Sequence, residues 1–263
     1  MTLAEATTPT SPPETACRLC KKETNEVGPL RASHIIPRFI TKLSKQNGKS
    51  LHFKTRQGIR LGQDDWKEHL LCDDCEQLLS EKHESVIKAL LFSGKKRPSV
   101  DGPLPGARPR GSNDKLALAL LSIFWRAIVA EREEYQQVHA PEYIESSLRK
   151  WICECRIPPD WDQLVSIKIQ ELCLHNGLVM PVVVNPFYRK VLSQERFEFV
   201  FIFGGYCITI GIPPSAEAFP RNQSLRSKSE SIRVKRIDCA DVPELKHMLK
   251  EMVAWADRHG DKF

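Results

Sequence analysis

Two Cys-x-x-Cys pairs, Cys17 with Cys20 and Cys72 with Cys75, constrain the fold of this chain more than any other feature. Each pair offers two thiolate ligands on one short turn, and two such pairs complete the tetrahedral coordination of one Zn²⁺. Because four protein ligands leave no open position on the metal, such a zinc would be structural. We therefore predict a small zinc-bound module; four buried or free thiols are the alternative.

The sequence around the two pairs predicts a treble-clef, or ββα, module. Short runs of strand-forming residues follow the first pair, and a turn at Gln57 and Gly58 joins two of them into a hairpin. From Cys72 onward, apolar residues recur at helical spacing as far as Leu91. Acids such as Asp73 occupy the first turn of this expected helix, where the helix dipole favours them.

The composition divides the chain of 263 residues into four parts. Residues 1–16 form a polar leader that we expect to be disordered, and residues 17–92 form the zinc-bound module. Residues 93–113 hold prolines, glycines and basic residues without apolar periodicity, which is typical of a linker. Residues 114–263 are expected to form an α+β domain, and no motif in them indicates its role.

This predicted second domain combines buried helices with an antiparallel sheet. Its first helix is apolar nearly all round, and a second, amphipathic helix follows Pro141. Strand-forming segments come next, two of them joined by Gly204 and Gly205, and a last helix ends near Gly260. Apart from the helix after Pro141, the expected elements span residues 114–137, 178–184, 197–203, 206–212, 231–237 and 241–260.

Several features indicate a cytoplasmic protein without a membrane partner. The most apolar stretch, Leu116 to Ala130, contains Arg126 and is too short to cross a bilayer of roughly 30 Å. The first residues contain no apolar segment of the kind that directs secretion. Nine cysteines are an odd number, which argues against a disulfide framework and favours a reducing compartment.

The positive charge of the chain is concentrated in its first part. Residues 1–113 contain 19 lysines and arginines against 13 acids, whereas residues 114–263 contain 20 of each. Between Val27 and Gln63 there are basic residues and no acid. Because such a tract attracts polyanions, we predict nucleic acid, DNA first, as the partner; a solvated basic face is the alternative. The candidate contacts are Arg31, Arg38, Lys42, Lys45, Lys54, Arg56 and Lys67.

A histidine lies inside this basic tract, in the sequence Ser33-His34-Ile35-Ile36-Pro37. The proline is expected to end a strand and to leave the imidazole of His34 at the strand terminus. A histidine with its reference pKa of about 6.5 can accept a proton at neutral pH and act as a general base. The alternative is a histidine of the core.

The order Cys-x-x-Cys, Ser-His-Ile-x-Pro and Leu-Cys-x-x-Cys followed by a polar residue resembles the zinc-bound branch of the HNH, or ββα-metal, endonucleases. The resemblance covers residues 17–92. It implies that His34 activates the attacking water and that Ser33 and Glu76 occupy the positions of ligands to a catalytic divalent ion. Lys67 stands where the family has an asparagine that braces the loop of the catalytic histidine. Ser33 and Lys67 depart from the family pattern, since a hydroxyl binds Mg²⁺ less well than a carboxylate.

The resemblance implies metal-assisted hydrolysis of phosphodiesters, with Mg²⁺ or another divalent cation as catalytic cofactor beside the structural zinc. Ser80, His83 and Glu84 lie on the same expected helix face as Glu76 and offer substitute ligands; a solvated face is the alternative. Two other functions stay open. One is a catalytically degenerate, zinc-bound module that binds nucleic acid, and the other is an interaction module with a protein partner through residues 114–263.

Overall fold

The chain combines helices with a mainly antiparallel sheet, which confirms the α+β class predicted from the sequence. The structure is a computed structural model, and residues 1–14 of the predicted leader and 93–110 of the predicted linker lie outside its described residues. The described residues are 15–46, 49–54, 58–62, 66–92, 111–174, 183–191, 196–212, 224–227, 234–243, 245–246 and 250.

The first part of the chain forms a ribbon, a small hairpin and a long helix. Its elements are α1 (Thr24–Val27), β1 (Arg31–His34), α2 (Arg38–Ser44), β2 (Lys45–Gln46), β3 (Lys49–Lys54), β4 (Gly58–Gly62), β5 (Lys67–Leu71), α3 (Asp73–Leu78), η1 (Leu79–Glu84), α4 (Ser85–Ile87) and η2 (Lys88–Phe92). The ribbon pairs β1 with β5 antiparallel, so that His34 lies opposite Lys67. The hairpin pairs β3 with both β2 and β4.

The segments α3 to η2 form one continuous helix that begins directly after Cys72. Asp73, Asp74 and Glu76 occupy its first turn, as expected from the helix dipole. The segments η1 and η2 are π-helical turns, which widen the helix and are frequent at functional sites. Strand β1, strand β5 and this helix together make a ββα arrangement.

The second part of the chain supplies two main helices and most of the larger sheet. Its elements are α5 (Ser112–Val129), η3 (Glu133–Tyr135), α6 (Glu142–Cys153), η4 (Trp161–Gln163), β6 (Ser166–Cys173), β7 (Val183–Val191), β8 (Arg196–Phe203), β9 (Tyr206–Ile212), β10 (Ser224–Leu225), β11 (Lys235–Asp238) and η7 (Cys239–Asp241). Within the described residues, the strand order of this sheet is β10-β6-β9-β8-β7-β3-β2. Strand β11 pairs parallel with β6, and β4 pairs with β3.

Several elements differ from their sequence predictions: the strand expected at 178–184 is β7 at Val183–Val191, and helix α2 and strand β5 were not predicted. Helix α5 ends at Val129, because the chain becomes extended at the next residue and the backbone N–H groups of Glu131 and Arg132 donate to the carboxylate of Glu68. Strand β6 was not predicted; it buries Glu171, which forms an ion pair of 2.7 Å with an arginine of β11. Most of the predicted last helix, residues 241–260, lies outside the described residues.

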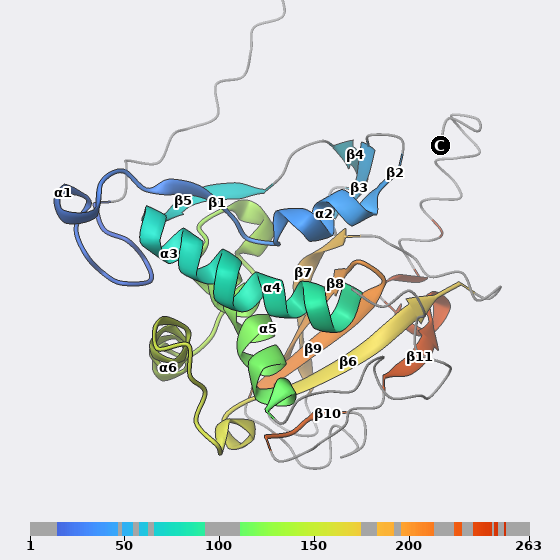
Figure 1. Cartoon of the computed structure of the whole chain (residues 1–263). Coiled ribbons are helices and arrows are strands. Elements are labelled where there is room, and N and C mark those ends of the chain that lie inside the picture. Colours follow the sequence, from blue (N-terminus) through green and yellow to red (C-terminus); the bar gives the residue numbers. More distant parts are fainter. Residues whose placement is uncertain are drawn as a thin grey trace, which may run out of the picture.

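The two predicted parts of the chain share one sheet and one core. Strand β3 of the hairpin runs parallel to β7, with His52 opposite Val183. Helix α5 packs against η1 and α4, and Figure 1 shows the long helix between the β1–β5 ribbon and α5. One hydrophobic cluster contains Ile35 and Leu70 from the first part together with Leu121 from the second. The second part therefore packs against the ribbon and the long helix and would hold in place any site that these two elements form.

Candidate functional site

The four cysteines of the two sequence pairs meet in one cluster. Their Sγ atoms all lie within 4.8 Å of one another, and the Sγ atoms of Cys20 and Cys72 are 3.8 Å apart. In a tetrahedral site with Zn–S bonds of about 2.3 Å, sulfur atoms lie about 3.8 Å apart. The cluster could therefore hold a metal ion such as zinc, and within the described residues no other group of metal-binding side chains is as close.

Backbone contacts fix the two cysteine pairs relative to each other. Cys17 accepts a hydrogen bond from the N–H of Lys21, whose positive φ of 63° closes the first turn. The N–H of Arg18 donates to the carbonyl oxygen of Leu70 in β5, which fastens this turn to the ribbon. Cys72 caps the start of α3, and its N–H donates to Sγ of Cys17 at 3.4 Å.

The electrostatics of the cluster favour a bound cation. A hydrogen bond with Cys75 lowers the pKa of Cys17 to about 4, and the same bond, together with burial, raises the pKa of Cys75. Burial also raises the pKa of Cys72. One thiolate thus opposes the ionisation of its neighbours, and four thiolates can exist together only around a positive ion.

A cleft of about 380 Å³ opens beside the ribbon and the long helix. It is lined by His34, Arg38, Asp73, Glu76, Gln77, Ser80, Glu81 and Glu84. These residues come from the end of β1, the start of α2 and the helical segments α3 and η1. The structure therefore brings His34 and Glu76 to the same cleft, whose lining holds four carboxylates and one arginine, while Arg31 and Arg126 pair with two of these carboxylates.

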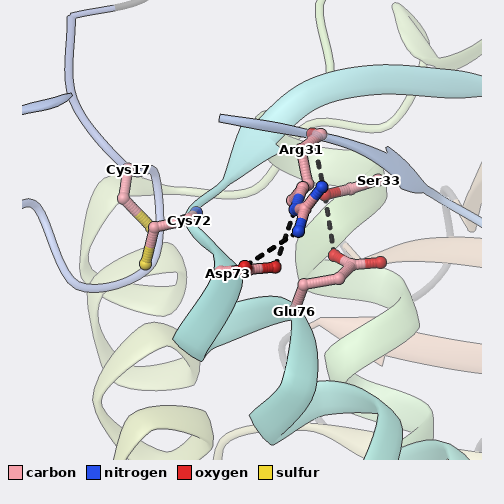
Figure 2. A network of polar contacts seen from close by, with 6 residues as sticks. All are labelled: Cys17, Arg31, Ser33, Cys72, Asp73 and Glu76. Carbon is pink, nitrogen blue, oxygen red and sulfur yellow. Dashed lines mark hydrogen bonds and ion pairs between the residues drawn. The ribbon is translucent and has the colours of Figure 1, made fainter. Parts of the chain in front are cut away.

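Glu76 is held from the strand side by Ser33. The serine is fully buried, and its hydroxyl donates a hydrogen bond of 2.8 Å to Oε2 of Glu76 (Figure 2). Ser33 thus reaches the carboxylate across the gap between β1 and α3 and fixes its orientation. His34, the next residue, is half-buried, and its Nε2 is shielded from solvent.

Arg31 forms a two-pronged ion pair with Asp73, which lines the cleft (Figure 2). Nε donates to Oδ1 at 2.7 Å and Nη2 donates to Oδ2 at 2.8 Å. This pairing raises the pKa of Arg31 and lowers that of Asp73. Both side chains are more than half exposed, so water screens the pair and Arg31 can exchange its partner for another anion.

A buried arginine from the second part of the chain reaches the far wall of the cleft. Nη1 of Arg126 in α5 donates to the carbonyl oxygen of His34 at 2.7 Å and to Oε1 of Glu84 at 2.9 Å. The sequence did not predict this residue for the site, because its distance along the chain from His34 gives no hint of a contact. The one signal in the sequence that could have indicated a role for Arg126 was its charge inside the most apolar stretch of the chain.

The helix residues offered as substitute ligands separate into two groups. Ser80 and Glu84 line the cleft. His83 points elsewhere: it is buried, with Nε2 3.3 Å from the carbonyl oxygen of Ile152 in α6. Desolvation lowers the pKa of His83 to about 4, so it is a neutral core histidine at pH 7.

The predicted nucleic-acid contacts are only partly described. Arg38 lines the cleft, and Lys42 and Lys67 are exposed on α2 and β5. Lys45 and Lys54 belong to β2 and β3, but their side chains lie outside the described part of the structure, as does the whole of Arg56. Among the basic residues with described side chains, Arg38 lines the cleft, Arg31 pairs with a cleft residue, and Lys67 belongs to the ribbon.

Comparisons with protein-family models, curated proteins and solved structures found no match to this chain. The resemblance to HNH endonucleases therefore rests on the sequence motifs. Among the described helices, none is long and apolar enough to cross a membrane.

Proposed function

We propose that this chain is an HNH-like, metal-dependent endonuclease that hydrolyses phosphodiester bonds of nucleic acid, with DNA as the first candidate. One observation carries the proposal: His34 at the end of β1 and Glu76 in the first turn of α3 line the same cleft, within a ββα arrangement next to four clustered cysteines. In this proposal the cysteines hold a structural Zn²⁺, which keeps the ribbon and the helix in register.

Hydrogen-bond partners distinguish the acids of the cleft. Asp73 is paired with Arg31 and Glu84 with Arg126, so their charges are offset. Glu76 and Glu81 instead accept hydrogen bonds from the neutral side chains Ser33 and Gln77. Arg31 donates its hydrogen bonds to Asp73 and acts on Glu76 only through its charge, so Glu76 keeps more of its own charge for a metal ion, which supports Glu76 as the ligand of the catalytic divalent cation.

The proposed mechanism gives each side chain one step. A divalent cation such as Mg²⁺, held by Glu76, would polarise the scissile phosphate and stabilise the leaving oxygen. His34 takes the proton of the attacking water; its Nε2 is shielded in the free chain, and catalytic contacts are often completed only with substrate bound. Arg38 and Arg31 bind phosphate oxygens of the backbone, Arg31 by exchanging Asp73 for a phosphate.

A plasmid-nicking assay with metal variation tests the proposal. Glu76→Gln keeps the shape of the side chain but removes its charge, so we expect Mg²⁺-dependent nicking to fall about 100-fold or more. The matched control is Asp74→Asn, which neutralises an exposed acid of the same helical turn that does not line the cleft. Equal nicking by wild type and Glu76→Gln, at equal zinc content, would refute the assignment.

One observation favours a second function, binding of nucleic acid without cleavage. The residue before His34 is a buried serine whose hydroxyl is already directed at Glu76, so the position next to His34 carries a hydroxyl where a carboxylate would hold the cation more tightly. This function predicts salt-dependent binding of DNA or RNA and no turnover with any divalent metal. A protein partner through residues 114–263 is a further proposal, and it would appear as a stable complex without affinity for nucleic acid.

A further inference from the structure

Arg126 is a buried charge that ordinary stability does not explain. Its side chain is 0 % exposed, and it lies in α5 among apolar residues. Two of its nitrogens, Nε and Nη2, are buried without a hydrogen-bond partner in the described part of the chain. Burying a guanidinium with unsatisfied N–H groups is costly, and well-packed apolar side chains often replace such charges without loss of stability. The position therefore suggests a role in the site.

The contacts of Arg126 join the two walls of the cleft. Nη1 binds the carbonyl oxygen of His34 at the end of β1 and the carboxylate of Glu84 in the π-helical turn η1. The strand end and the helix both line the cleft, and both are held by one rigid, planar group from a third element. Moving that group would displace the main chain of His34 directly.

We propose that Arg126 is a positioning residue of the cleft: it holds the main chain of His34 so that the imidazole stays at the acid-lined wall. This inference rests on the proposed nuclease function. In the resembling family the brace is an asparagine, and Lys67 occupies its position here; Lys67 is exposed. The arginine of α5 supplies the brace in its place. The second part of the chain thereby acquires a function, since it completes the site of the first.

The guanidinium also sets the charge of the cleft. It offsets Glu84, as Arg31 offsets Asp73, whereas Glu76 and Glu81 accept hydrogen bonds from the neutral side chains Ser33 and Gln77. Replacing Arg126 alone would leave the charge of Glu84 without this partner and would also remove the contact to the main chain of His34. The test must therefore separate these two effects.

A double variant, Arg126→Met/Glu84→Gln, removes the brace without leaving an unpaired charge. In the full-length, zinc-loaded protein we expect kcat for plasmid nicking to fall about 10- to 100-fold, with KM for the plasmid little changed, because misplacement of a reacting group lowers the rate more than the binding. Arg126→Lys, which keeps a cationic donor, should recover part of kcat. The matched control is Arg236→Met/Glu171→Gln, which removes a partly buried ion pair between β11 and β6.

Hydrogen–deuterium exchange gives a readout that needs no nuclease activity. The double variant should exchange faster than wild type in the peptide covering residues 31–36, while the peptide of α6 and the zinc content stay unchanged. If wild type fails to nick DNA under any metal, the proposed function is wrong, and the exchange measurement still tests the brace. Unchanged exchange at residues 31–36 in the double variant would overturn the inference, as would an unchanged kcat.

Discussion

His83 and Glu84 are neighbours in the π-helical turn η1, yet their side chains lie in different environments. Glu84 lines the cleft, whereas His83 is buried against the carbonyl oxygen of Ile152. Regular helical spacing from Glu76 places both on one face, since positions seven and eight residues apart lie close together on an α-helix. A π-helical turn alters that spacing, and no local sequence pattern predicts such a turn. The sequence thus predicted the helix but not which of these two side chains reaches the cleft.

The burial of His83 predicts how stability depends on pH. Its pKa is lowered to about 4 in the folded chain, against about 6.5 when unfolded, so between these values the unfolded state binds more protons. Its contribution is therefore present above pH 6.5 and is lost as the pH falls toward 4. For this residue alone we expect the free energy of unfolding to drop by about 2 kcal/mol between pH 7 and pH 5.

Urea unfolding at both pH values measures this drop, and a His83→Gln variant isolates the histidine. The amide can still donate to the carbonyl oxygen of Ile152 but does not titrate, so the variant should lose about 2 kcal/mol less than wild type over the same interval. An identical pH dependence in the two proteins would show that His83 is not desolvated in solution.

At the scale of elements, the cysteine cluster joins the turn that carries Cys17 and Cys20 to the ribbon and to α3. The turn that carries Cys17 and Cys20 precedes a helix of only four residues, and its other anchors are the buried side chain of Leu19, an ion pair between Arg18 and Glu131 and a few backbone contacts. A short segment of this kind buries too little apolar surface to offset its loss of conformational entropy. The metal would supply that free energy, because a structural zinc contributes directly to folding.

Removal of the metal should therefore loosen the first part of the chain. A structural Zn²⁺ contributes roughly 10 kcal/mol or more in small domains, so we expect chelation by a strong zinc chelator to lower the Tm by about 10 °C or more. Thermal unfolding followed before and after chelation, with zinc re-added as the control, measures this change. A Tm that does not respond to chelation or to Cys75→Ser would contradict a structural zinc in the cluster.

The sequence predicted elements with strong local signals and missed those that depend on distant partners. The β3–β4 hairpin, the helix after Cys72 and the buried start of α5 all follow from turns, caps or apolar periodicity. Strand β6 was missed because its buried Glu171 is stabilised by Arg236, which lies 65 positions later. The early end of α5 likewise depends on Glu68, a residue of β5.

At the scale of the whole molecule, the two predicted parts share one core and one sheet, which brings α5 next to the cleft. Composition separates residues 17–92 from 114–263, but the structure shows one shared core and a sheet that continues from β7 into β3. Residue motifs predicted the four cysteines, which cluster in the structure, and the family resemblance pointed to His34 and Glu76, which line one cleft. The same motifs could not indicate that α5 contributes Arg126, because contacts between distant segments leave no periodicity in the sequence.

The most direct test of the proposed function is the rate of Mg²⁺-dependent plasmid nicking by zinc-loaded wild type, His34→Ala and His69→Ala. His69 is an exposed histidine of β5 that does not line the cleft, and it controls for the loss of an imidazole. Removal of a general base lowers rates by about 10²- to 10⁴-fold, so we predict a loss of that size in His34→Ala alone, with zinc content and Tm unchanged. Nicking by His34→Ala at the wild-type rate would contradict the account.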